Sequence, residues 1–242
     1  LVTLSPDFKT ATINVAPGGI SGSADIFATI SLTGSNPRSK TLVKDSGNVC
    51  TITSSTTPVD IGKSDIFKFN GIYSASGKSY KGTWLSGTSY VANDLVTYNG
   101  TAYYTGTSSV GQNPTSNTIA WTQATDISSS FATDNGQRDA YYDHGYVTNK
   151  SGTSIGSVLV AFDYFTHSGG TGFFDVNSYP VPYVNIPSFT SIQYGATYNL
   201  RDVIDFRPVA APTANDTGVV NTANNTQVAA AISYATLNPS TT

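Results

Sequence analysis

The sequence predicts an all-β protein: an antiparallel, sandwich-like domain that carries a small inserted β module and ends in an irregular tail. Three observations predict this class. Short runs of alternating apolar and polar residues recur between Gly, Pro and Asn, as is typical of strands and turns. Aromatic residues reach 12% of 242 residues and charged residues only 11%, a composition that favours strands. Helical spacing is not sustained before residues 226–235, where one or two helical turns are expected.

Residues 1–81 form the first part of the predicted domain. The segment 24–34 predicts a strand because it places four apolar side chains on one face: Ile26, Ala28, Ile30 and Leu32. The segments 48–53 and 64–74 show similar patterns, with turn residues between them. We therefore expect these segments to pair as antiparallel strands.

Residues 82–124 differ in composition and form the predicted inserted module. They hold two tryptophans, four tyrosines and almost no charge. Asn99 and Gly100 join two strand-like runs, which predicts a hairpin with a type I′ turn. A segment this short builds only a small core, so we expect Trp84 and Trp121 to pack with Tyr103 and close the module.

Residues 125–211 form the second part of the domain, and residues 212–242 a linker and tail. The segment 157–165 is the most apolar, so it predicts a central strand. Three prolines in 172–189 indicate an edge strand or an extended connection. The strict alternation in 198–208 predicts a strand with paired charges from Arg201, Asp202, Asp205 and Arg207.

The composition excludes several classes of protein. A net charge of −3 argues against a nucleic-acid partner, which needs a basic face. No apolar run is long enough to insert into a membrane, and no basic cluster favours binding to its surface. The chain has no methionine and no signal-peptide pattern at its start, so we expect a processed form or a segment of a longer protein. Cys50 is expected to be a buried apolar residue.

The sequence shows no motif that predicts a catalytic or metal site. Residues 152–156 have the form G-x-S-x-G around Ser154, but they lie in a polar loop that precedes a strand, so no nucleophile elbow is expected. His144 and His167 are the only histidines, and their spacing to Asp143, Asp163 and Asp175 fits no metal-ligand pattern. We expect no metal and no cofactor.

Paired aspartates are the remaining enzymatic alternative. All fifteen acidic residues are Asp, and glutamate is absent. A pair drawn from Asp134, Asp139, Asp143, Asp202 and Asp205 would suit a glycoside hydrolase or depolymerase, since either carboxylate type can serve.

The stretch DNGQRDAYYDHG, residues 134–145, concentrates charge in a chain that has little. Asn135 and Gly136 predict a tight turn. Arg138 is a planar donor that can hold two carboxylates, from Asp134, Asp139 or Asp143, or from Asp202 and Asp205. Because no nucleophile, metal set or glutamate accompanies it, we interpret the stretch as a polar brace and expect no enzymatic activity. The brace comprises Asp134, Arg138, Asp139, Asp143, Arg201, Asp202, Asp205 and Arg207.

Four segments carry a resemblance to a known family: FATDNGQRDAYYDHG, VAFDYFTHSGGTGFFDVNSYP, IPSF and YNLRDVIDFRP. In this order they resemble a domain of unassigned function in virion structural proteins of T4-like tailed phages, including cyanophages. The resemblance covers roughly residues 64–208 without the middle segment. It implies a tail, baseplate or fibre component located in the virion, other virion subunits as partners, a homo-oligomer such as a trimer, and no known catalytic residues.

The middle segment is similar to small chitin-binding modules. The matching residues are Trp84, Tyr90, Val96, Tyr98, Gly100, Tyr103, Gly111, Pro114 and Trp121. That family binds sugar through aromatic residues where this chain has Thr107 and Ser108. A glycan-binding protein, with a host-surface glycan as partner, therefore remains an alternative that would use Tyr90, Tyr104, Trp84 and Trp121.

Overall fold

The computed structural model describes residues 2–4, 11–13, 36–53, 56–139, 141–168 and 172–207. Within these ranges the chain forms strands, and its helical segments are 3-10 turns of three residues each. The all-β prediction is confirmed. The strand expected over 24–34, the tail at 212–242 and its helical turns lie outside the described residues.

The central sheet has three antiparallel strands in the order β4 (Lys40–Ile52), β15 (Gly156–His167) and β6 (Ile66–Ser74). The predicted central strand is therefore confirmed as β15. Both of its faces are covered: Val158 and Val160 pack into one core, while Leu159 and Ala161 pack into another. Burial on both sides explains why this stretch is apolar without alternation.

A second sheet packs on one face of the first. Its order is β13 (Phe131–Asp134), β14 (His144–Asn149) and β5 (Val59–Ser64). Apolar side chains from both sheets form the core between them: Cys50, Ile52, Ile61, Ile66, Ile72, Phe131, Val147, Val158, Val160 and Phe162. This is the arrangement of a β-sandwich. The Cys50 thiol is buried here, and burial, with the nearby charge of Asp60, raises its pKa to about 11.

The module between β6 and β13 has its own four-stranded sheet. The order is β12 (Trp121–Gln123), β10 (Thr101–Thr105), β9 (Asp94–Tyr98) and β7 (Ser79–Thr83), and β8 (Ser89–Tyr90) pairs with β11 (Ser109–Val110). Asn99 and Gly100 join β9 to β10 with φ of 50° and 76°. Two positive φ angles are what a type I′ turn requires, so the predicted hairpin is confirmed.

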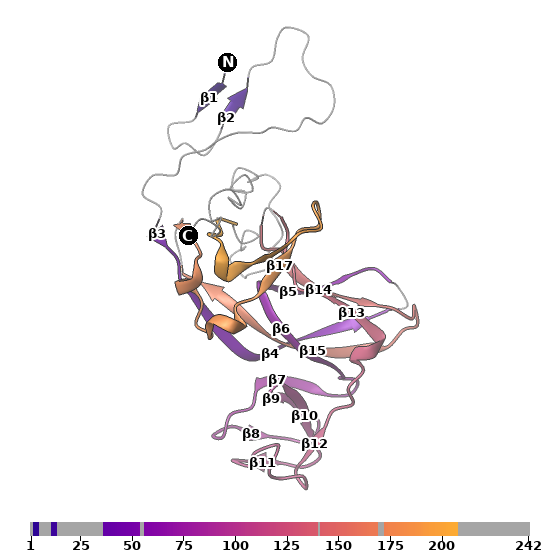
Figure 1. Cartoon of the computed structure of the whole chain (residues 1–242). Coiled ribbons are helices and arrows are strands. Elements are labelled where there is room, and N and C mark those ends of the chain that lie inside the picture. The colour runs from indigo at the N-terminus through magenta and orange to yellow at the C-terminus, as the bar shows by residue number, and fades with distance from the viewer. Residues whose placement is uncertain are drawn as a thin grey trace.

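The module packs two cores, one on each face of its sheet. On the outer face Trp121, Tyr90 and Val96 are buried, with Trp84 and Tyr103 against them, as expected. On the inner face Leu95 and Ala102 pack on Leu159 and Ala161 of β15. Figure 1 shows the resulting layers, with the module below the central sheet and the β5–β14–β13 sheet on its other side.

The remaining elements are short. β1 (Val2–Leu4) pairs with β2 (Ala11–Ile13), β16 (Gly172–Phe173) with β3 (Asn36–Pro37), and β17 (Ser188–Thr190) with β18 (Thr197–Asn199). The 3-10 turns are η1 (Ser128–Ser130), η2 (Val176–Ser178), η3 (Tyr183–Asn185) and η4 (Leu200–Asp202). The segment from η2 to η4 packs Tyr179, Ile186, Phe189 and Leu200 around Phe165 and so closes the end of β15.

The strand predicted over 198–208 is wrong. β18 ends at Asn199, η4 follows, and only an isolated bridge joins Asp205 to Phe174. The Asp205 carboxylate accepts a hydrogen bond from the backbone N–H of Arg207, at 2.9 Å. This local contact competes with a regular strand ladder.

Candidate functional site

The stretch at residues 134–145 forms a tight connection between β13 and β14. Gly136 has φ +77°, and a Cβ at this position would lie 2.2 Å from the backbone oxygen of Asp143. The Gly136 N–H donates to Asp134 Oδ1 at 2.9 Å, and the Asp143 N–H donates to the Gly136 carbonyl at 2.7 Å. Only glycine fits this close approach, and the turn brings Arg138 beside Asp143.

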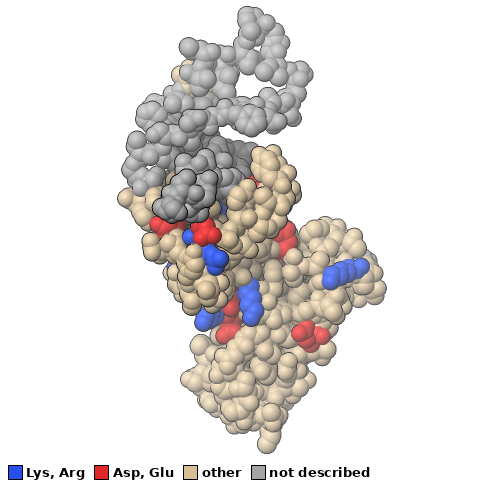
Figure 2. Space-filling view, viewed as in Figure 1, with Lys and Arg blue, Asp and Glu red and all other residues tan. Residues whose placement is uncertain are grey.

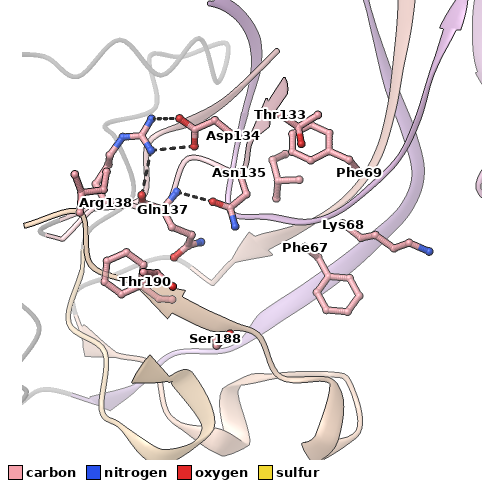
Figure 3. A pocket seen from close by; sticks show the side chains of 13 residues that line it. Phe67, Lys68, Phe69, Thr133, Asp134, Asn135, Gln137, Arg138, Ser188 and Thr190 are labelled. Carbon is pink, nitrogen blue, oxygen red and sulfur yellow. Dashed lines mark hydrogen bonds and ion pairs between the residues drawn. The ribbon is translucent and has the colours of Figure 1, made fainter. Parts of the chain in front are cut away.

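Arg138 is held by two of the predicted carboxylates. Its Nη1 and Nη2 donate to the two oxygens of Asp134 at 3.0 and 2.9 Å, and Nη2 lies 3.2 Å from Asp143 Oδ2. Burial opposes the charge, but the Asp134 and Asp143 carboxylates leave the pKa of Arg138 raised. Figure 3 shows the guanidinium facing Asp134. The guanidinium is therefore held by carboxylates of the same turn, with 20% of the Arg138 side chain exposed.

Three other members of the predicted brace lie elsewhere. Asp139 accepts a hydrogen bond from the Gln193 N–H at 3.1 Å. Arg201 lies over the ring of Tyr183 at 4.9 Å, and its Nε is 3.9 Å from Asp202. Asp139 and Asp202 thus have other partners, and the expectation that either one pairs with Arg138 is corrected.

Arg207 is the buried arginine of the domain, with 1% of its surface exposed. Its Nε and Nη2 donate to Asp205 at 3.1 and 2.9 Å, and its Nη1 donates to the Arg138 carbonyl at 3.0 Å. The guanidinium lies between the rings of Tyr142 and Phe189, at 4.3 and 4.5 Å. Asp205 therefore pairs with Arg207 and not with Arg138.

A second buried ion pair adjoins the first. Lys40 Nζ donates to Asp65 Oδ2 at 2.6 Å and to the Tyr142 hydroxyl at 3.1 Å. Tyr142 in turn donates to Asp205. His167 Nε2 lies 2.5 Å from Asp65 Oδ2. We call these six connected residues the buried polar network: Lys40, Asp65, Tyr142, His167, Asp205 and Arg207.

Aromatic rings enclose the Lys40 end of the network. Nζ lies within 4.4 to 5.4 Å of four ring centroids, those of Tyr142, Phe165, Phe174 and Tyr179. The side chains of Lys40, Asp65 and His167 are only 0%, 4% and 6% exposed. Cations over ring faces are stabilised, and the rings keep water away from the charges.

Burial sets the protonation of the network. It lowers the pKa of Lys40, against the charge of Asp65, and it lowers the pKa of His167. It would raise the pKa of Asp65, but Lys40 and His167 outweigh it and the pKa is lowered. Burial, with Asp205, raises the pKa of Tyr142 well above its usual value, so Tyr142 stays a hydroxyl donor.

A shallow pocket of about 540 Å³ lies beside Arg138, between β6, the β13 turn and β17 (Figure 3). Its lining includes Phe67, Phe69 and Lys68 from β6. Asp134 is the carboxylate of this lining, and Arg138 neutralises it. Two free carboxyls do not face each other across this pocket, so it lacks the pair that glycoside hydrolysis needs.

The structure corrects two of the four predicted sugar-binding residues. Tyr90 and Trp121 are each 2% exposed, and their rings pack edge to face at 5.2 Å inside the module. Their faces cannot stack on a sugar. Trp84 and Tyr104 are half-buried: Trp84 packs against Tyr98, and Lys78 Nζ lies 4.7 Å from the Tyr104 ring centroid.

The other residues tested by sequence have structural contacts. His144 is 1% exposed with Nδ1 2.9 Å from Asp60, and the Ser154 hydroxyl donates to the Ile52 carbonyl at 3.3 Å. No cluster of three or more His, Cys or Asp side chains suited to a metal occurs in the described ranges. The helical segments in the same ranges are too short to span a bilayer.

Sequence reasoning missed Lys40 and Asp65. A lysine within a strand normally points to solvent, so nothing in its type marks it as buried. One signal was available. Lys40 and Leu42 are two residues apart and share a face of β4, and Leu42 packs against the core around Phe165.

The resembling segments thus meet in one place. Tyr142, His167, Phe189 and Arg207 come from the four segments in turn, and all contact the buried polar network or belong to it. Comparisons of the chain with family models, with curated proteins and with solved structures found no match.

Proposed function

We propose that this chain is a structural component of a tailed-phage virion, in the tail, baseplate or fibre, and that it carries contacts between subunits rather than catalysing a reaction. The proposal starts from the resemblance of the four segments to a virion-protein domain. The observation that carries it is that the charged side chains of these segments are held by partners within the protein, and that Arg207 and Asp205 of the last segment contact the first. The hydrogen bonds of three charged side chains, Arg138, Asp205 and Arg207, are made to other groups of the protein. Such a network is expected to make a domain rigid.

The surface of the module supports a role in assembly. Asp94 is the charged residue of segment 82–124, and it lies 3.5 Å from Lys81 of β7. Figure 2 shows that the face of the module turned to the viewer carries almost no charge. The module also exposes several large apolar side chains: Leu85, Val91, Val110 and Ile119. A weakly charged surface with exposed apolar groups suits contact with another subunit.

The location in the virion can be tested on particles of a phage whose genome encodes the chain. Purified particles would be labelled with gold-conjugated antibody against this chain and imaged by electron microscopy. We expect label on the tail, baseplate or fibres, and peptides of the chain in the mass spectrum of the particles. Absence of both from intact particles would reject the proposal.

Self-assembly can be tested by light scattering over a range of concentrations. We expect a homo-oligomer that Val110→Asp dissociates, because Val110 is 59% exposed on the module and a charge there would be desolvated in an interface. Ser108→Asp, on an exposed neighbouring position, is the matched control and should leave the oligomer intact. A monomer at every concentration would contradict the homo-oligomer.

Glycan binding is the weaker alternative, because burial removes Tyr90 and Trp121 from the available stacking faces. Binding of the chain to a glycan array that is lost on Tyr104→Ala would favour it.

Paired-Asp hydrolysis is weaker still, since Asp134 and Asp143 share the Arg138 guanidinium. Release of sugars from host-surface polysaccharide would favour that reading.

A further inference from the structure

Three neighbouring strands place Lys40, His167 and Asp65 side by side. Lys40 begins β4 and is the register partner of His167, the last residue of β15. Asp65 directly precedes β6, and its carbonyl accepts a hydrogen bond from the Phe165 N–H at 3.0 Å. Because backbone hydrogen bonds of the central sheet fix the three backbones, the three side chains are held close together.

We propose that Lys40 and Asp65 become joined by an intramolecular isopeptide bond between Nζ and Cγ. Nζ lies 2.6 Å from Oδ2, the oxygen bonded to that carbon. The two side chains are 0% and 4% exposed, so the amine and the carboxyl meet in an enclosed site. Fixing two reactants in contact gives a large effective concentration.

The reaction balances without any further reactant. The Lys40 ammonium and the Asp65 carboxylate give one amide and one water. A proton passes from Nζ to Oδ2, and the freed electron pair of Nζ forms the bond to Cγ. A second proton then passes from nitrogen to Oδ2, and this oxygen leaves as water with the electrons of the broken C–O bond.

Two neighbours are placed to assist this step. Gln137 Nε2 lies 3.3 Å from Asp65 Oδ1, the oxygen that remains, and its N–H would stabilise negative charge developing there. His167 Nε2 lies 2.5 Å from Oδ2, the oxygen that leaves, and its N–H can donate a hydrogen bond to that oxygen while the protons arrive from Nζ.

The amide product would keep two hydrogen bonds of the ion pair, while His167 Nε2 would lose Asp65 Oδ2 as its partner. The amide N–H would keep the Tyr142 hydroxyl as its acceptor, at 3.1 Å from Nζ, and the amide oxygen would keep Gln137 as donor. Burying an ion pair among aromatic rings is costly, and the amide removes both charges. The Asp205–Arg207 pair remains, so the network stays balanced in charge.

Intact mass under denaturing conditions tests the proposal on the full chain. Denaturation separates an ion pair but not an amide. We expect a mass about 18 Da below that of the sequence, the mass of one water. Lys40→Arg, which keeps the charge, should restore the full sequence mass of the variant. Lys44→Arg, on an exposed position of the same strand, should retain the deficit.

Peptide mapping gives the position of the bond. Trypsin should release residues 39–44 joined to residues 64–68, with no cleavage after Lys40. Full sequence mass of the denatured wild-type chain, or these two peptides unlinked, would overturn the proposal whether or not Lys40→Arg folds. In chain recovered unfolded, before the bond has formed, Gln137→Leu should slow bond formation on folding by about 100-fold, and an unchanged rate would remove Gln137 from this role.

Discussion

Arg207 and Asp205 show how a chain with few charges can still depend on them. Only 11% of its residues are charged, yet this pair is 1% exposed and its hydrogen bonds join the end of the domain to the Arg138 turn. A buried ion pair adds little net stability compared with apolar residues, but loss of one partner leaves the other uncompensated. The cost of a substitution here therefore depends on which partner survives.

Asp205→Asn is expected to lower the free energy of unfolding by about 3–5 kcal/mol, because it leaves the Arg207 charge buried without a carboxylate. Urea denaturation measures this change. Asp202→Asn is the matched control: its side chain is 45% exposed and lies 3.9 Å from Arg201, so it should change the free energy by about 0.5 kcal/mol or less. Equal costs for the two variants would contradict the burial argument.

His167 predicts a dependence of stability on pH. Burial lowers its pKa, with Asp65 opposing, so the unfolded chain takes up this proton more readily than the folded chain. The free energy of unfolding should therefore fall as the pH drops below about 6.5, the pKa of a free histidine. Urea titrations at pH 7.5 and 5.5 measure the fall. His167→Gln should reduce it, and the same fall in this variant would assign it to other groups.

At the scale of elements, the connection from β13 to β14 depends on one glycine. A side chain at Gly136 would meet the backbone of Asp143 and His144, which cannot rotate away. Gly77 has a similar φ, +71°, but nothing lies within 4 Å of its missing Cβ. Comparing the same substitution at Gly136 and at Gly77 therefore separates the cost of backbone strain from the cost of steric overlap.

Gly77→Ala is expected to cost about 1–2 kcal/mol from the left-handed backbone alone. Gly136→Ala should cost about 2–5 kcal/mol, because overpacking adds to that strain. Thermal or urea denaturation of both variants compares them. If the two substitutions cost the same, then the approach of Asp143 to Gly136 is looser than the structure shows.

Sequence predicted the elements whose cause is local. The β9–β10 hairpin follows from Asn99-Gly100, and β15 from a continuous apolar run that both faces bury. The strand expected over 198–208 failed for a reason that alternation cannot reveal. The backbone N–H of Arg207 donates to the Asp205 side chain. The sequence therefore alternates with a period of two where the chain forms a turn.

The candidate site was predictable only in part, because only some of its contacts join residues that are close in the sequence. Arg138 and Asp134 are four residues apart, so their pairing lies within reach of local reasoning. Lys40 and Asp65 are 25 positions apart, and Asp65 and His167 are 102 apart. Their meeting depends on strand pairing and on bulges in β15, which a single sequence does not specify.

At the scale of the whole molecule, β15 links the domain and the module. Leu159 and Ala161 on one face belong to the core shared with the module, and Val158 and Val160 on the other face belong to the sandwich core. Loss of either layer would expose apolar side chains of β15, because residues 158–161 are buried on both faces. We therefore expect the two parts to unfold together.

The chain carries separate natural probes for this expectation. Both tryptophans, Trp84 and Trp121, lie in the module, and the single cysteine, Cys50, lies in the sandwich core with its pKa raised to about 11. Tryptophan fluorescence and maleimide labelling of Cys50 should report the same urea midpoint. Two separate midpoints in the wild-type chain would contradict the coupling.

Leu159→Ala should lower both midpoints together, with a cost of about 2–5 kcal/mol, because it leaves a cavity in the shared core. Leu85→Ala, at a module position that is 61% exposed, should change either midpoint little. A shift of the fluorescence midpoint alone in Leu159→Ala would mean that the module unfolds on its own.

Within residues 36–207, the first and last described segments lie near each other. Residues 36–37 pair with 172–173, and Phe174 bridges to Asp205, so the three segments lie side by side. Figure 1 shows the module at the opposite end. Tension applied between residues 36 and 207 would then be carried by these short pairings rather than by the two sheets of the sandwich. The module would lie outside the path of the force. It could therefore contact a neighbouring subunit while the paired strands of the sheets carry no load.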